Sequence, residues 1–298
     1  MFSIGQEISQ NTAVAVAWSS AGLAKHRRCA LAVLTSNLVL SIWGSESRPR
    51  APHSWKRAVV VNNELERYFD ALNGSEKDQS EAGRAKTEER RRRIRSFAWS
   101  PATLPIFSAS KPQSCAGWGE HFLAVSNDNN EVILLHVQAP YDLLLAHRTK
   151  WTIRAVHHFP APSSHHGSPA RTFDDFVQQQ RFVGHLAWSP WWIAEGGDLE
   201  AVLAYTTNAK LIFTRLRVSH PFPSSSLEIT SGKTSAYALK TQLSAPLRWA
   251  PKTDGGHIQI IAFSMDGITS FSLPLAAELH MVTSKHDLVG KWDNVVGK

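Results

Sequence analysis

Cysteine is scarce in this chain, and its scarcity excludes two ways of stabilising a fold. Only Cys29 and Cys115 occur among the 298 residues. Two thiols cannot supply the four ligands of a zinc ribbon or the several pairs of a disulfide framework. We therefore expect a fold held together by its hydrophobic core, in a reducing compartment.

Long hydrophobic runs are also missing. The most apolar stretch, Cys29 to Trp43, is interrupted by Thr35, Ser36 and Asn37. It falls short of the roughly 20 apolar residues that span a bilayer. The opening MFSIGQEISQ has no basic segment followed by an apolar run, so it does not resemble a signal peptide. The sequence predicts a soluble intracellular protein without membrane contact.

Sequence motifs of catalysis are absent as well. There is no G-x-S-x-G elbow, phosphate-binding P-loop, H-E-x-x-H pair or dinucleotide fingerprint. The segment Gly117 to Phe122 has two glycines without a strand–loop–helix context, and nothing pairs Asp174 and Asp175 with a positioned acid or base. We expect no enzyme, no cofactor, no metal and no small-molecule substrate.

What the chain does have is an internal repeat of four copies. Each copy has a short apolar strand ending in Trp followed by Ser or Ala, then a loop, then two apolar runs separated by a polar turn. The strands begin the segments VAVAWSSAG, RSFAWSPAT, GHLAWSPWW and PLRWAPKTD. Val, Ile, Leu, Thr and Phe dominate the runs, which is the chemistry of strands, and each copy offers four of them. Four strands are one blade of a β-propeller.

The sequence therefore predicts an all-β, WD-repeat-like β-propeller, with a pair of β-sandwiches as the alternative. One domain is expected over 1–298, with repeat units at about 12–72, 94–159, 182–243 and 244–298. The units exceed the roughly 40–45 residues of a plain blade, so we expect loop insertions at 73–93, 160–170 and 219–235, which are charged or rich in Pro and Ser. Only four blades can be recognised in the sequence. Either the propeller is incomplete or further blades are too degenerate to recognise.

The amino-acid sequences of the repeats resemble the N-terminal propeller of the fungal 90-kilodalton, delta-type subunit of transcription factor IIIC. The resemblance rests on AWSSAGLAKHRRCALAVLTSNLVLSIW (Ala17 to Trp43), with support from RRRRIRSFAWSP, LAVSNDNNEVILLHV and, more weakly, HLAWSPWW. It implies a scaffold subunit in the nucleus, in a complex that binds promoter DNA of transfer-RNA genes. Its partners would be the other subunits of that factor and the initiation factors of RNA polymerase III.

The chain departs from this family in two respects. Family members usually have another blade ahead of the first motif, and they end in a cysteine-rich zinc domain that two cysteines cannot build. The chain thus resembles an internal portion of the family architecture. Histone acetyltransferase activity, attributed to some animal relatives, is one alternative function, although no motif here carries it. A general WD-repeat adaptor for an unrelated assembly is another.

A run of arginines is the sharpest chemical feature of the sequence. Arg90, Arg91, Arg92, Arg93 and Arg95 place five guanidinium groups within six positions, while the whole chain has a net charge of only +7. Guanidinium groups bind phosphate in a bidentate manner, and basic runs also act as nuclear-import signals. Contact with acidic partners is a further alternative. The run is otherwise a solvated linker whose arginines pair with Glu88, Glu89 and nearby acids.

Two weaker candidates for partner contact lie in predicted loops. Lys25, Arg27 and Arg28 form a second basic group in the first repeat, which is otherwise a solvated loop face. Trp191 and Trp192 follow the first strand of the third repeat. An exposed Trp pair suits a binding hot spot, and the alternative is that it covers the end of the third blade.

The remaining singular residues have plainer explanations. Trp18, Trp99, Trp188 and Trp249 recur once per repeat at the same strand position, so we expect them to pack blade against blade. His157, His158, His165 and His166 could in principle close a tetrahedral metal site. The second pair lies among Pro, Ser and Gly, which favours a surface loop instead.

Overall fold

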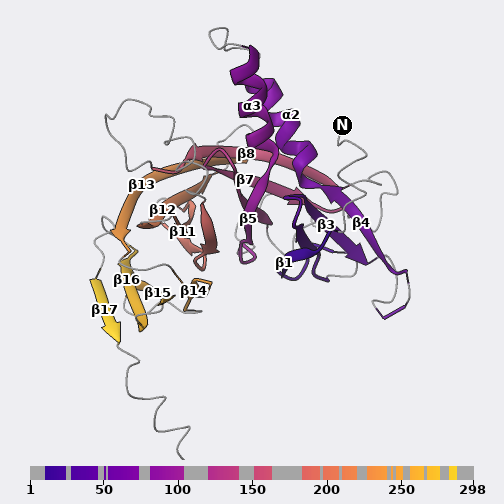
Figure 1. The fold of residues 1–298 in the computed structure, drawn as a ribbon. Helices are drawn as coiled ribbons and strands as arrows, with labels where there is room; N and C mark the ends of the chain where they lie inside the picture. Colours follow the sequence, from indigo (N-terminus) through magenta and orange to yellow (C-terminus); the bar gives the residue numbers. More distant parts are fainter. Residues whose placement is uncertain are drawn as a thin grey trace, which may run out of the picture. The chain divides into compact units, whose positions relative to one another are not determined.

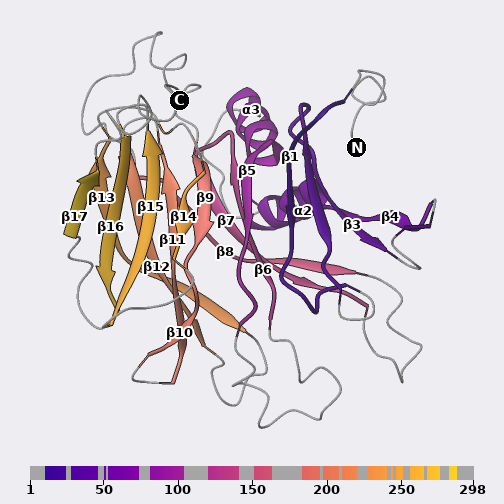
Figure 2. The ribbon, with the colours of Figure 1, turned by 90° about the horizontal axis from the view of Figure 1, so that it is seen from below.

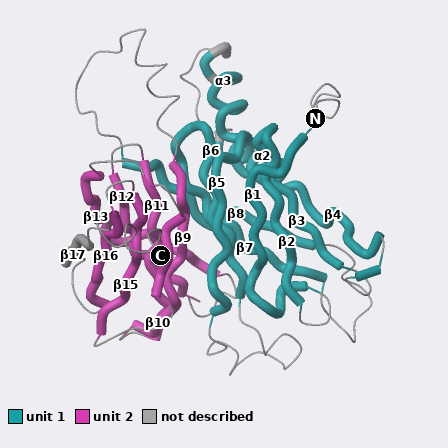
Figure 3. The backbone as a smooth tube through the Cα atoms, turned by 60° about the horizontal axis from the view of Figure 1, so that its bottom comes forward, with its two compact units in different colours: residues 1–170 teal, residues 171–298 magenta. Residues whose placement is uncertain are grey.

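The chain folds into two compact units, residues 1–170 and 171–298, and each is described by itself (Figure 3). The computed structural model describes residues 11–24, 28–45, 50–51, 53–73, 81–103, 120–140, 151–162, 183–194, 197–207, 210–219, 227–239, 243, 246–250, 256–264, 267–275 and 282–286. Antiparallel sheets dominate both units, as the strand-like repeats predict (Figure 1).

The first unit contains two four-stranded sheets, which we call blade 1 and blade 2. Blade 1 has the order β1 (Ala13–Trp18), β2 (Leu31–Thr35), β3 (Leu40–Ser45) and β4 (Trp55–Val60). Blade 2 has the order β5 (Ile94–Trp99), β6 (Phe122–Asn127), β7 (Glu131–Gln138) and β8 (Thr152–Pro160). Every strand pairs antiparallel with the next one along the chain, which confirms the strand order predicted for the first two repeats.

The second unit contains blades 3 and 4, which show the same order with one addition. Blade 3 consists of β9 (Gly184–Trp188), β10 (Trp192–Ile193), β11 (Leu199–Thr206), β12 (Lys210–Ser219) and β13 (Glu228–Ala238). Both β9 and the short β10 pair with β11. Blade 4 has the order β14 (Arg248–Trp249), β15 (His257–Ser264), β16 (Gly267–Pro274) and β17 (Val282–His286), and Figure 2 displays its strands side by side.

A helical hairpin replaces much of the loop predicted at 73–93, and that prediction is wrong. Helix α2 (Val61–Asn73) continues directly from β4, and α3 (Glu81–Arg92) leads into β5 (Figure 1). Val61, Leu65 and Phe69 recur at helical spacing and are buried, so α2 is amphipathic. Helix α3 has no apolar stripe, but its residues are good helix formers and its last turn carries arginines that suit a helix C-terminus.

A strand also occupies part of the predicted loop 219–235. Strand β13 begins at Glu228 and pairs with β12 over most of its length, although its exposed middle is rich in Ser, Thr and Gly. Backbone hydrogen bonds to β12, and not burial of side chains, hold this segment in the sheet. Its polar composition therefore led to the wrong prediction of a loop. The predicted loop 160–170 lies mostly outside the described residues.

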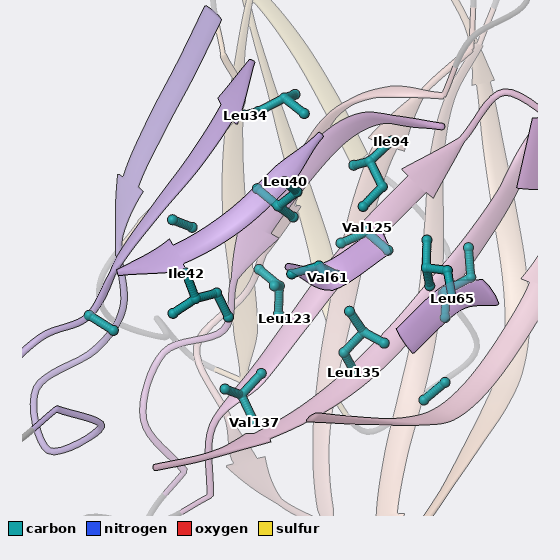
Figure 4. Packing of buried hydrophobic residues seen from close by; sticks show 14 of the residues in the cluster. Leu34, Leu40, Ile42, Val61, Leu65, Ile94, Leu123, Val125, Leu135 and Val137 are labelled. Atoms are coloured by element: carbon teal, nitrogen blue, oxygen red, sulfur yellow. The ribbon is translucent and has the colours of Figure 1, made fainter. Parts of the chain in front are cut away.

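One hydrophobic core joins blade 1, blade 2 and α2 in the first unit. Leu34, Leu40 and Ile42 of blade 1 point toward Ile94, Leu123, Val125 and Leu135 of blade 2, while Val61 and Leu65 of α2 close one side (Figure 4). A second core joins blades 3 and 4 through Val202, Ala204, Leu211 and Phe213 against Leu247, Ile258, Ile260 and Phe271. Within each unit, two neighbouring blades are thus packed face to face.

The helices are short and amphipathic or polar. Within the described part of the chain, none is long and apolar enough to cross a membrane.

Candidate functional site

The predicted arginine run ends helix α3 and begins β5, and most of it is paired with acids inside the first unit. Arg91 donates from Nε to Glu131 Oε1 at 3.1 Å, and its guanidinium lies 4.7 Å from the centre of the Phe69 ring. Its side chain is only 19% exposed. This arginine therefore serves as an anchor of the hairpin on blade 2.

The other arginines have carboxylate neighbours too. Arg92 contacts Glu66 of α2 at 2.9 Å, with Asp70 at 3.9 Å. Arg93 contacts Glu89 at 2.9 Å and lies 3.9 Å from Asp128, which also pairs with Arg95. These contacts neutralise most of the charge of the run, as the alternative of internal pairing with nearby acids predicts.

Arg90 differs from its neighbours in the run. Its Nη2 atom is buried and has no hydrogen-bond partner in the structure. Its backbone carbonyl accepts hydrogen bonds from the amides of Arg93 and Asp128, at 3.3 and 3.2 Å. The backbone here closes the C-terminus of α3 against the β6–β7 turn.

A polar cluster beneath α3 holds the hairpin on blade 2. Glu131 accepts hydrogen bonds from Asn127 Nδ2 at 2.8 Å and Asn129 Nδ2 at 3.0 Å, besides the one from Arg91. The Tyr68 hydroxyl lies 2.7 Å from His158 Nδ1. Burial lowers the pKa of His158 and raises the pKa of Tyr68, and the Glu131 charge raises the latter further. Both side chains are therefore neutral at pH 7.

Asn62 fixes the base of the hairpin and was not singled out from the sequence. Its side-chain amide donates to the carbonyls of Leu38 at 2.9 Å and Arg92 at 2.6 Å, and its Oδ1 accepts from the Leu40 amide at 2.9 Å. A polar residue following the apolar run RAVVV was the available signal. Tyr68 and Glu131 carried no signal, because their partners lie far away in sequence.

The second basic group is only partly described. Lys25 and Arg27 lie outside the described residues. Arg28 forms a small backbone bridge with Ala24, with N–O distances of 2.7 and 3.0 Å. The partner contact predicted for this group stays a prediction.

The Trp pair of the third repeat belongs to the body of blade 3. Trp191 is 8% exposed and its ring centre lies 5.5 Å from that of Trp188. Trp192 is half-buried in β10, with the Arg215 guanidinium 5.7 Å from its ring centre. This placement agrees with the alternative that the pair covers the end of the blade, because an interface anchor needs an exposed ring.

The four repeat tryptophans do not share one environment. Trp188 is 6% exposed, Trp99 packs against the core of the first unit, and Trp249 packs against the core of the second. Trp249 Nε1 also donates to the Ala187 carbonyl of blade 3 at 3.1 Å. Trp18 departs from the predicted burial, because the residue is 56% exposed.

Trp18 is exposed because it lies on the outer face of blade 1, the side of that sheet opposite the core. The register sets Trp18 beside Leu31 and Val16 beside Val33, whereas Ala32 and Leu34 alternate to the core side. The same outer face also holds Trp43 and Trp55 and, between them, the polar residues Ser41, Ser45 and the exposed Arg57. The rings of Trp18 and Trp55 are in contact, with centres 5.6 Å apart.

The described residues give no support to a metal site formed by the four histidines. His157 and His158 lie on β8, and burial lowers the pKa of both. His165 and His166 lie outside the described residues. Among the residues that are described, no three His, Cys, Asp or Glu side chains gather as metal ligands would.

One serine and one histidine approach each other as in hydrolases. Ser20 Oγ lies 2.9 Å from His121 Nδ1, in the loops after β1 and before β6. Burial lowers the pKa of His121 to about 4, an effect that the nearby Glu120 charge opposes. An imidazole with that pKa is a weak base at pH 7. The contact therefore links blade 1 to blade 2 and is poorly suited to activating a nucleophile.

Comparison with known proteins identifies the repeat. A family model described as the β-propeller domain of transcription factor IIIC subunit delta matches residues 1–298. Among solved structures, the β-propeller domain of Vanderwaltozyma polyspora Nup133 aligns with 6% identity and a TM-score of 0.40, over 93% of this chain and 64% of that one. No curated protein sequence matches the chain.

Proposed function

Because the chain belongs to the family of transcription factor IIIC subunit delta β-propeller domains, we propose that it is a non-catalytic scaffold subunit of such a complex. In this role it supports transcription of transfer-RNA-type genes by RNA polymerase III, in the nucleus. Its partners are the other subunits of the factor and the polymerase III initiation factors, with promoter DNA bound by the complex as a whole. We also propose that both units belong to one propeller domain over 1–298, since one family model matches that whole range.

The match of the family model over residues 1–298 carries this proposal. The chemistry of the described residues agrees with a scaffold in two respects. The arginine run forms ion pairs with Glu66, Glu89, Asp128 and Glu131. These pairs stabilise the hairpin and compete with any phosphate for the same guanidinium groups. The pKa of His121 in the Ser20–His121 pair is too low for general-base chemistry.

Affinity purification of the tagged chain from its own cells, followed by mass spectrometry, tests the scaffold role. We expect subunits of transcription factor IIIC and polymerase III initiation factors in the eluate. Recovery of none of them with a bait that melts cooperatively would overturn the role while leaving the propeller intact. Titration of acetyl-coenzyme A by calorimetry should give no binding heat, and a saturable signal would favour the acetyltransferase alternative.

Nuclear localisation through the arginine run needs a matched pair of variants. Replacing Arg90 to Arg93 with Gln removes the basic run and also breaks the ion pairs of the hairpin. The variant Glu66→Gln/Glu131→Gln breaks two of the same ion pairs and keeps every arginine. If the run is an import signal, only the arginine variant loses nuclear fluorescence. Equal loss in both variants would assign the effect to a loosened hairpin.

A further inference from the structure

The residue after each repeat Trp is a serine in blades 1, 2 and 3, and there it makes a recurring pair of hydrogen bonds. Each serine is at most 4% exposed. Its amide donates to a carbonyl of the facing chain segment at 2.8 or 2.9 Å, and its Oγ accepts the amide of that same residue at 2.8 to 3.2 Å. We call this pair of bonds the serine clamp. The clamped pairs are Ser19–Ala30, Ser100–Phe122 and Ser189–Val202.

The clamp completes an antiparallel pair at the point where the first strand of the blade ends. In a regular ladder two facing residues exchange two backbone hydrogen bonds, and here the hydroxyl oxygen replaces the second carbonyl. In blades 1 and 3 the same hydroxyl also donates to the carbonyl of the next residue, Ser20 or Pro190, at 2.9 Å. A buried amide without an acceptor is costly, so the clamp holds the strand end closed.

Blade 4 keeps only half of the clamp, because an alanine follows its repeat Trp. The amide of Ala250 donates to the Gln259 carbonyl at 2.8 Å, as the serine amides do in the other blades. A methyl group cannot accept the Gln259 amide in return. The clamp position thus contributes one hydrogen bond between β14 and β15, where each of the other blades has two.

Strand β14 is also the shortest first strand of the described blades. It has two residues, Arg248 and Trp249, against six in β1 and β5 and five in β9. Pro246, two residues before it, lies outside the strand and has no amide hydrogen to donate to a ladder. The preceding contact with β15 is the isolated bridge between Leu243 and Ser264. Among the described residues, few backbone bonds therefore hold β14 to its neighbour.

The Trp249 side chain attaches β14 to blade 3 as well as to its own sheet. Its Nε1 donates to the Ala187 carbonyl of β9 at 3.1 Å, and its ring meets the Phe213 ring of β12 edge-on, with centres 6.3 Å apart. The ring is only partly buried against the core of the second unit. The attachment of β14 thus depends on one side chain more than on its backbone ladder.

We propose that β14 is a movable strand, which separates from β15 in a local opening while the rest of blade 4 stays paired. Trp249 leaves its contact with Phe213 when the strand opens, and Ala250 makes the opening frequent because it cannot form the clamp. Strands β15 and β16 pair along the whole length of both, so they remain closed. Segments with few backbone bonds populate such open states most. The inference concerns the fold itself and does not depend on the proposed function.

Amide hydrogen exchange, measured at single residues by nuclear magnetic resonance on the full chain, tests this opening. After correction for intrinsic rates, we expect the Ala250 amide to exchange at least about fivefold faster than the equivalent amides of Ser100 and Ser189. Amides paired between β15 and β16 should exchange more slowly than that of Ala250. Equal protection of Ala250 and Ser189 would overturn the proposal, as would exchange of β14 and of the β15–β16 pairs at a single common rate.

Variants at position 250 separate the clamp from other causes of exchange. Ala250→Ser supplies the missing acceptor, so exchange at this position should slow about fivefold, with no change at Ser189. Ala250→Cys adds a side chain of similar size whose sulfur is a weak acceptor, so its exchange should stay within about twofold of the wild type. Unchanged exchange in Ala250→Ser, or equal slowing in both variants, would contradict the role given to Ala250.

The variant Trp249→Phe tests the side-chain anchor. It keeps an aromatic ring against Phe213 but removes the donor to the Ala187 carbonyl. Residues 248–250 should then exchange about fivefold faster, while the amides of β11 are unchanged. Exchange of these residues at the wild-type rate would contradict the proposal, because the indole would then not hold β14 in place.

Discussion

At the scale of single residues, two side chains hold distant parts of the first unit together. Asn62 connects the loop before β3 with the end of α3 through three hydrogen bonds and is 2% exposed. His121 joins blade 2 to Ser20 of blade 1 while buried and neutral. Buried polar groups of this kind are costly once a partner is removed, so both residues make measurable contributions to stability.

The variant Asn62→Ala should lose about 1–3 kcal/mol of unfolding free energy, because it leaves the carbonyls of Leu38 and Arg92 without their donor. Urea denaturation measures the loss as a lower midpoint at unchanged slope. The control is Asn63→Ala on the exposed side of the same helix turn, which should change stability by less than about 0.5 kcal/mol. An equal loss of unfolding free energy in both variants would show that the Asn62 hydrogen bonds do not stabilise the fold.

The stability of the chain should fall in acid through His121. Its pKa is about 4 in the fold, against an ordinary value of 6.5 for a histidine in an unfolded chain. The unfolded state therefore takes up a proton first, so this contribution is complete above pH 6.5 and lost as pH falls toward 4. The difference between wild type and His121→Asn in unfolding free energy should shrink by about 3 kcal/mol over that range. A difference constant with pH would contradict the assignment.

At the scale of elements, the four sheets and helix α2 were predictable from the sequence, whereas helix α3 was not. Alternating apolar runs around polar turns identify the strands of each blade, because a half-buried sheet imposes that pattern on its own sequence. Helix α2 also left a pattern in Val61, Leu65 and Phe69, which a search for helical spacing would have found. Helix α3 left none, because ion pairs with Glu66 and Glu131, distant in sequence, hold it in place.

The hairpin should depend on Glu131 and hardly on Glu89. Glu131→Gln removes the countercharge of a largely buried arginine, so we expect a loss of about 2 kcal/mol and faster amide exchange from residues 88–93. Glu89→Gln breaks the Arg93 pair on the surface, where Glu89 is 64% exposed, and should cost at most about 0.5 kcal/mol. Exchange that accelerates equally in both variants would show that the hairpin is held by its apolar side alone.

The same element limits how far site prediction from the sequence could go. Five clustered arginines predicted a binding site. The acids that pair with Arg91, Arg92 and Arg95, however, come from the start of β7, from α2 and from the β6–β7 turn. Trp18 shows the opposite error. Its repeat position predicted burial, whereas its exposure depends on what packs on blade 1, which the repeat pattern does not encode.

At the scale of the whole molecule, charge and packing favour protein partners over direct DNA binding. The net charge of +7 is modest for 298 residues, and the densest basic run is paired internally. Among the described residues of the first unit, Val14, Val16 and Trp18 are exposed apolar side chains on one strand. If the proposed scaffold function holds, we therefore expect the chain to contact DNA only as part of its complex.

The purified chain should bind duplex DNA weakly and without sequence preference. We expect a Kd no tighter than about 1 µM at physiological salt, rising steeply with salt concentration as counterion release requires. Fluorescence anisotropy with a transfer-RNA promoter duplex and a scrambled duplex of equal length measures both properties. Tight binding that distinguishes the two duplexes would contradict the scaffold function.

The exposed outer face of blade 1 has a consequence for the supply of this protein in the cell. Where this face is left uncovered, Val14, Val16 and Trp18 lie exposed together on the edge strand β1. Surfaces of that kind engage chaperones and lead to aggregation or degradation. The steady amount of this protein would then depend on how completely that face is covered in the cell, as well as on the rate of synthesis.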